Sequence, residues 1–151
     1  MKDITFIEER YDEIISGIKP EWLSEWEPLS EYISSLPDWK QAIYLIVNLD
    51  NQVFNGGFHQ YFTNGYGAFA PEAIKVLQLI GARETAEILQ HAYDIVNKGG
   101  DVPAVFREKV LNKRYLQLIA DDDLFEPLGR LDNAYANSGE DVIEALLNYY
   151  I

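Results

Sequence analysis

The amino-acid sequence predicts an all-α fold, with one domain of about eight helices spanning residues 1–151. Apolar residues recur three and four positions apart along almost the whole chain, whereas the two-residue alternation typical of half-buried strands is absent. The chain has 151 residues and is 48% hydrophobic, which suits one domain with a substantial core. No Ser/Gly-rich linker, repeat or low-complexity tract divides it.

Proline and glycine delimit the N-terminal helices, which we expect at residues 4–18, 28–36 and 37–55. The apolar stripe of the first helix ends near Gly17 and Pro20. Pro28 favours the start of the second, because proline is well accommodated in a first helical turn. The third begins at Pro37-Asp38, and we expect Asn55-Gly56-Gly57 to end it.

The same spacing predicts further helices at residues 70–81, 84–98, 116–121, 128–136 and 141–150, with a short one beginning at Pro103. Pro71 lies where the first turn of the 70–81 helix should be, and Gly81 follows its last apolar residue. Gly99-Gly100 closes the helix after it.

The chain is strongly acidic, with 25 acidic and 12 basic residues and a formal net charge of −13. The acids concentrate at both ends: residues 1–31 hold nine acids and three bases, and residues 114–151 hold eight and two. Such a surface repels nucleic acid and anionic membranes and attracts basic partners. We therefore expect a basic protein partner, without direct binding to nucleic acid or to a membrane.

The candidate partner-binding residues are the acids of the two ends: Glu9, Asp12, Glu13, Glu21, Glu25, Glu27, Glu31, Asp121, Asp122, Asp123 and Glu126. The apolar stripe of the first helix must face the core, which directs Glu9, Asp12 and Glu13 largely outward. Acids four residues apart on a helix, such as Glu9 and Glu13, are separated by about 6 Å, close to the spacing of neighbouring phosphates on a DNA strand. The alternative interpretation is a solvated acidic face that serves only solubility.

Few residues suit catalysis. There is no cysteine, so a thiol nucleophile is excluded, and the lack of disulfides fits a cytoplasmic location. His59 and His91 are the only near-neutral bases, and the glycine spacing matches no nucleotide-binding loop. We expect a non-enzymatic protein without catalytic residues, cofactor or metal. The triplet Glu87, His91 and Asp94 shares one helix face, which we interpret as solvated rather than metal-binding.

The most distinctive segment runs from Asn55 to Gly67. Phe58, Tyr61 and Phe62 should share one face of a short helical turn and pack into the core. Four polar residues lie on its other side or beside it: Asn55, His59, Gln60 and Asn64. They either build a pocket for a small molecule or cap backbone groups at a packed helix–turn–helix corner.

The run Asn55-Gly56-Gly57-Phe58, followed by Gln60-Tyr61-Phe62 and Asn64, resembles a bacterial family known as domain of unknown function 4375. Ile80-Gly81-Ala82 and the tail from Leu131-Asp132 to Tyr149 extend the resemblance, which covers most of the chain from about Trp39 onward. It implies an all-helical fold. The best-studied type of that family is an acidic DNA mimic, a dimer that occupies the DNA-binding face of a transcription factor.

The resemblance therefore implies a homodimer whose partner is a DNA-binding transcription factor. Two other functions stay open. The protein could be an immunity or antitoxin-like inhibitor of a basic toxin, because the same negative charge would serve that purpose. It could also be a small-molecule-binding domain that uses the 55–64 corner.

Overall fold

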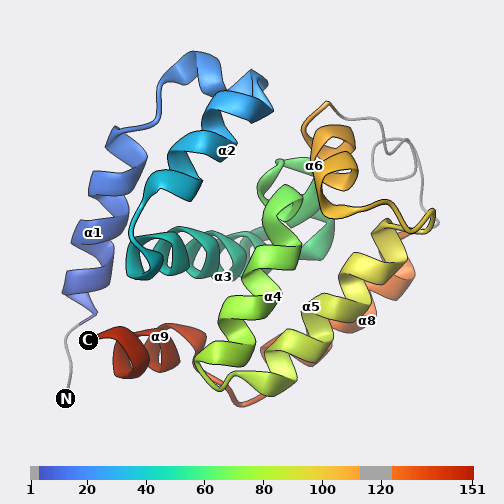
Figure 1. Ribbon diagram of the computed structural model, residues 1–151. Helices are drawn as coiled ribbons and strands as arrows, with labels where there is room; N and C mark the ends of the chain where they lie inside the picture. The colour runs from blue at the N-terminus through green and yellow to red at the C-terminus, as the bar shows by residue number, and fades with distance from the viewer. Residues whose placement is uncertain (1–3, 113–123) are drawn as a thin grey trace.

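The computed structural model describes residues 4–112 and 124–151, and within these ranges it contains α-helices and short 3-10 helices but no β-strand (Figure 1). The elements in chain order are α1 (Thr5–Ser16), η1 (Pro20–Ser24), α2 (Trp26–Ser35), α3 (Asp38–Thr63), η2 (Tyr66–Phe69), α4 (Ala70–Leu79), α5 (Arg83–Val96), α6 (Pro103–Leu111), α8 (Phe125–Ala136) and α9 (Val142–Tyr150). The predicted all-α class is confirmed, and so is the number of helices, with eight α-helices in the described residues.

Most predicted boundaries agree with the structure to within a few residues. α2 begins at Trp26, so that Pro28 lies inside its first turn rather than at its start. α8 begins at Phe125, three residues before the predicted start. The helix predicted at 116–121 lies outside the described residues.

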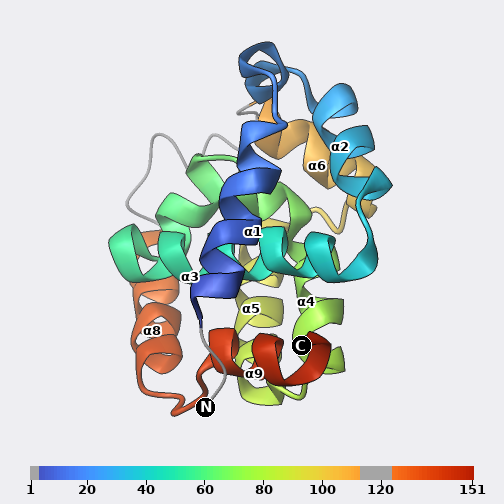
Figure 2. The ribbon, with the colours of Figure 1, turned by 90° about the vertical axis from the view of Figure 1, so that its left-hand side faces the viewer.

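α3 is the central element of the fold. It packs against α1, α4, α8, α9 and η2, and Figures 1 and 2 show it crossing the middle of the molecule. Five consecutive side chains near its start, from Ala42 to Ile46, are buried. An amphipathic surface helix buries a single stripe, so burial around the whole circumference indicates a helix enclosed by its neighbours. No helix in the described ranges is both long and apolar enough to cross a membrane.

The prediction that Asn55-Gly56-Gly57 ends the third helix is confirmed at Gly57, where the backbone leaves the helical conformation with φ 77° and ψ −177°. α3 therefore consists of two helical stretches that meet at this kink, and the second runs to Thr63. The helical pattern resumes at once because Phe58, Tyr61 and Phe62 are almost completely buried in the core, as the sequence predicted. The glycine pair thus ends one helical stretch, and a second stretch begins directly after it.

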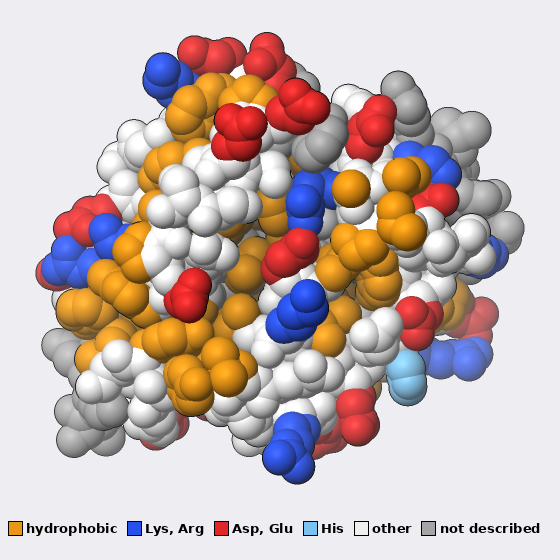
Figure 3. Space-filling model, viewed as in Figure 1, with side chains coloured by type: hydrophobic (Ala, Val, Ile, Leu, Met, Phe, Trp, Pro, Cys, Tyr) orange, Lys and Arg blue, Asp and Glu red, His pale blue; other side chains and the backbone are white. Residues whose placement is uncertain are grey.

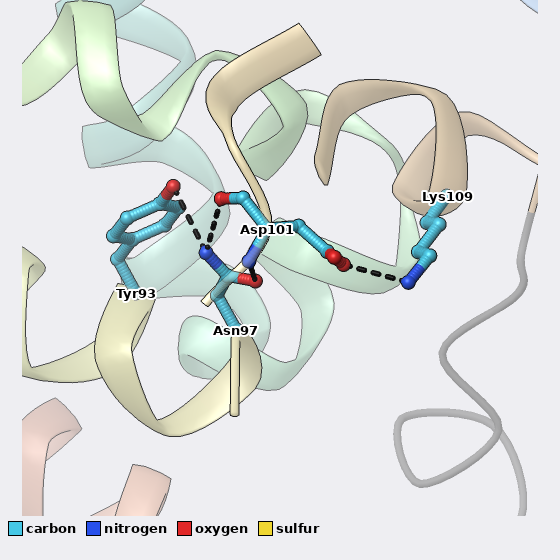
Figure 4. A network of polar contacts seen from close by, with 4 residues as sticks. All are labelled: Tyr93, Asn97, Asp101 and Lys109. Atoms are coloured by element: carbon cyan, nitrogen blue, oxygen red, sulfur yellow. Dashed lines mark hydrogen bonds and ion pairs between the residues drawn. The ribbon is translucent and has the colours of Figure 1, made fainter. Parts of the chain in front are cut away.

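Two polar contacts fasten the C-terminal half. The carboxylate of Glu140, which lies just before α9, accepts hydrogen bonds from the backbone N–H of Thr85 at 2.7 Å and from its hydroxyl at 2.6 Å. Glu140 therefore caps the start of α5 from a distant part of the chain. Beyond the end of α5, Asn97 bonds to both backbone groups of Asp101, whose side chain pairs with Lys109 of α6 (Figure 4).

Candidate functional site

The acids of α1 lie on the solvent side of the helix, as the apolar stripe predicts. Ile7 and Ile14 are buried against the core, whereas Glu9, Asp12 and Glu13 are exposed. Ile4, which the sequence placed in the same stripe, is half-exposed because it precedes the first turn of the helix. That part of the stripe prediction is wrong.

Arg10 partly neutralises this surface. Its guanidinium pairs with Glu13 and lies 3.7 Å from the Glu9 carboxylate. The guanidinium also lies over the ring of Phe6, with the Cζ of Arg10 5.0 Å from the ring centroid. Arg10 therefore offsets the repulsion between Glu9 and Glu13 that their spacing would otherwise produce. Asp12 makes no salt bridge with any described residue.

A second group of acids follows on η1, on α2 and at Glu25 between them. All four of its members are exposed: Glu21, Glu25, Glu27 and Glu31. Figure 3 shows acidic side chains gathered at the top of the molecule, where Figure 1 places η1 and the start of α2. The base nearest in sequence is Lys19, which lies over the Trp22 ring with its nitrogen 5.4 Å from the centroid. We call the exposed acids of residues 8–31 the N-terminal acidic surface.

The structure does not join Glu126 to that surface. Glu126 is exposed in the first turn of α8 and pairs with Arg130 one turn later. Figure 1 shows α1 on the left-hand side and the start of α8 on the right-hand side, with α3 packed between them. The other predicted acids of this end, Asp121, Asp122 and Asp123, lie outside the described residues.

Three of the four corner residues share one amide network, joined by Gln52, which the sequence analysis did not single out. The Gln52 side-chain carbonyl accepts from Gln60 at 2.9 Å and from Asn64 at 3.0 Å. Asn55 donates to the carbonyl of Gln60 at 3.2 Å. Gln52 lies 8 and 12 residues before its two partners and on the other side of the Gly57 kink, so helical spacing gives no signal for these contacts.

His59 lies apart from this network. Its ring stacks on that of Phe125 from α8, with centroids 4.3 Å apart. A groove of about 400 Å³ does open beside the corner, and Gln52, Asn64 and Tyr66 are among the residues that line it. Of the predicted pocket residues, only Asn64 contributes to this groove.

The kink at Gly57 depends on Asp132 of α8. Because Gly57 leaves the helical conformation, the N–H of Phe58 is free to donate to the Asp132 carboxylate, at 2.7 Å. A Cβ at Gly57 would overlap that carboxylate, only 2.8 Å from its Cγ. Burial raises the pKa of Asp132, while the Phe58 bond and the charge of His59 oppose the shift. The run from Asn55 to Phe62 therefore contains a bend in α3 that Asp132 of α8 caps.

A family model described as DMP19-like protein matches residues 34–151. The chain belongs to the DMP19-like family. The matched range of this DMP19-like chain contains all of α3 with its kink, and α8 with the Asp132 that caps the kink. No curated protein and no solved structure matches the chain. The name domain of unknown function 4375 stays a prediction.

The N-terminal acidic surface of this DMP19-like chain precedes the matched range. Residues 1–31 carry a net charge of −6 and residues 34–151 a net charge of −7, so the charge density is far higher before the match. The family match therefore covers residues 34–151, whereas the N-terminal acidic surface lies before it.

The geometry identifies no metal centre among the residues that the structure describes, where no three His, Cys, Asp or Glu side chains gather closely enough to hold an ion. The helix-face triplet Glu87, His91 and Asp94 is exposed on α5, and Asp94 accepts a hydrogen bond from Gln90 at 2.9 Å. This surface is better suited to solvent than to coordination.

Proposed function

We propose that this protein is a non-enzymatic DNA mimic that binds a basic, DNA-binding protein in the place of DNA. The DMP19-like family to which the chain belongs is a family of DNA mimic proteins. Its carboxylates would compete with phosphates for the same Arg and Lys side chains, because both are oxyanions that accept charge-assisted hydrogen bonds. A DNA-binding transcription factor is the class of partner that fits this chemistry.

The observation that carries the proposal is the N-terminal acidic surface. Its eight acids are all exposed and lie on α1, η1 and α2 or, for one of them, between the last two elements: Glu8, Glu9, Asp12, Glu13, Glu21, Glu25, Glu27 and Glu31. The same stretch offers two described bases, Arg10 and Lys19. Such an excess of negative charge attracts a basic surface over a distance of about 10 Å at 0.1 M salt. Affinity for the partner should therefore fall steeply as salt rises.

The test replaces Glu9, Asp12 and Glu13 by Gln, Asn and Gln. The partner is first captured from the source cell on the immobilised chain and purified, and its binding is then titrated over a salt series. We expect the triple variant to bind the partner more weakly, and its affinity should depend less steeply on salt. With fewer ionic contacts, fewer counterions are released when the complex forms. We expect folding to be nearly unchanged, because Arg10 already offsets the repulsion that the substitutions remove.

The matched control removes three exposed acids elsewhere, with Glu87→Gln, Asp94→Asn and Glu144→Gln on α5 and α9. It has the same net charge as the triple variant. Equal losses in both variants would mean that net charge, rather than this surface, attracts the partner. A labelled DNA duplex gives the second readout, because a mimic displaces it from the partner. A partner that holds the duplex and the chain together would contradict mimicry.

The identity of the captured partner separates the alternatives. A basic toxin that has no DNA-binding face would support the immunity or antitoxin-like function instead. The groove beside Asn64 favours a third function, a small-molecule-binding domain, because its amides and tyrosines offer both polar and apolar contacts. Gln52→Ala would then abolish ligand binding while leaving the partner's affinity unchanged.

A further inference from the structure

A groove of about 390 Å³ opens between α1, α3 and α9. Figure 2 shows α1 crossing in front of α3, with α9 below them. Its apolar lining comes from all three helices, with Ile7 of α1, Val47 of α3 and Ile143 of α9. The groove therefore adjoins the N-terminal acidic surface and extends it into the matched part of the chain.

Three carboxylates share this groove: Glu8 and Asp12 from α1, and Asp50 from α3. The first two are exposed, whereas Asp50 is partly buried. None of the three pairs with a cation in the described part of the chain, and no basic residue lines the groove.

Asp50 is an unusual member of the group. It accepts a hydrogen bond from the hydroxyl of Tyr135 on α8, at 2.8 Å to its Oδ1. Burial raises the pKa of Asp50, as does the nearby charge of Asp141, although the Tyr135 bond opposes the shift. A partly buried carboxylate without a cation is unfavourable for folding, so its presence at a groove suggests that the compensating charge comes from a ligand.

We propose that this groove receives an arginine side chain of the basic partner. Its aliphatic stem would pack on Ile7, Val47 and Ile143, and its guanidinium would lie among the carboxylates of Glu8, Asp12 and Asp50. Arginine fits better than lysine, because its five donors can serve several carboxylates at once and its weaker hydration suits a partly apolar site. The inference deepens the proposed function and rests on it for the identity of the partner.

The test uses N-propylguanidinium chloride, which reproduces the arginine side chain and needs no partner protein. The full chain is titrated at constant ionic strength, and backbone amide shifts are followed by NMR. We expect saturable shifts confined to the groove, at Tyr11, Asp50 and Asn51 among others. Propylammonium should bind more weakly, and n-butanol, which has no charge, should give no shifts in the groove.

Three variants sharpen the test. Asp50→Asn retains an acceptor for Tyr135 and should weaken binding of the probe roughly three- to tenfold. Glu8→Gln changes an exposed residue that cannot affect the core, so it should weaken binding even if Asp50→Asn disturbs folding. Glu27→Gln, an exposed acid of α2 outside the groove, should bind the probe like the parent.

Shifts spread evenly over all acidic helices, or unchanged binding in both Glu8→Gln and Asp50→Asn, would overturn the proposal. It would also be overturned if the probe binds in the groove but these two variants bind the partner protein as tightly as the parent does. That result would leave DNA mimicry intact. Conversely, a partner that binds the chain and DNA simultaneously would contradict mimicry while the probe still occupies the groove.

Discussion

Replacing Gly57 with alanine tests the bend on which the contact between α3 and α8 depends. Gly57 has φ 77° and ψ −177°, a backbone region that is almost exclusive to glycine. The new Cβ would also overlap the carboxylate of Asp132, which holds the N–H of Phe58. The substitution therefore combines backbone strain with the displacement of a hydrogen-bond acceptor.

The two effects can be given magnitudes separately. Backbone strain of this kind costs about 1–3 kcal/mol. Pushing Asp132 away leaves the N–H of Phe58 unsatisfied beside a buried ring, which costs about 1–3 kcal/mol more. The sum, about 2–6 kcal/mol, is a large part of the 5–15 kcal/mol typical of domains. For a chain of this length it corresponds to a fall in Tm of roughly 4–24 °C. Gly57→Val should be more damaging still, because a β-branched residue is worse at positive φ.

Thermal melts followed by circular dichroism provide the measurement, and Gly139→Ala is the matched control. Gly139 has φ 76°, nearly that of Gly57, but a Cβ there would meet no atom within 4 Å. Gly139→Ala therefore reports the cost of a Cβ at positive φ without a collision, and Gly57→Ala should melt several degrees lower. The reasoning about Asp132 would be refuted by equal melting temperatures for the two variants. A Gly57→Ala melt within a degree of the parent would refute the argument from strain as well.

His59→Ala should leave folding and partner binding largely intact, since stacking on the half-exposed Phe125 is worth about 0.5–1.5 kcal/mol. Loss of a bound ligand in this variant would instead favour the small-molecule function. Glu140→Ala should lower the free energy of unfolding in urea by about 1–3 kcal/mol, because it strands the N–H and hydroxyl of buried Thr85, while Glu144→Ala should have little effect. Because the pKa of Asp50 is higher in the folded state than in the unfolded state, protonation of Asp50 stabilises the fold. This stabilisation is complete below the unfolded-state pKa of about 3.9 and is lost as pH rises through the folded-state pKa. Asp50→Asn should therefore be more stable than the parent near neutral pH, with the difference shrinking in melts toward pH 4, whereas a difference that is constant with pH would contradict the assignment.

Local patterns predicted the helices well because helix formation is governed by neighbours three and four residues apart. The α1 stripe, the proline starts and the buried aromatic face of Phe58, Tyr61 and Phe62 all have this local cause. The break at Asn55-Gly56-Gly57 also has a local cause, but the residue that stabilises it does not. A carboxylate 74 residues away accepts a hydrogen bond from the N–H that the kink frees.

The candidate site divides in the same way. Outward display of Glu9, Asp12 and Glu13 follows from helical periodicity alone, so the sequence could predict it. The groove and the position of Asp50 could not be predicted, because Asp50 meets Tyr135 across 85 residues and the groove walls come from three separate helices. The role of Asp132 was hidden for the same reason, and that of Gln52 was hidden because its partners lie beyond the kink in α3.

The sequence by itself therefore determined the all-helical class, the approximate helix boundaries and the acidic character of the N-terminal elements. Each is a property of composition or of local spacing, which a single helix already expresses. Only the tertiary structure decided that Asp132 stabilises the kink in α3, that Glu126 lies away from the N-terminal acidic surface, and that three carboxylates share one groove. Those features depend on which helices pack side by side, and that choice is made by burial of the common core rather than by any one segment.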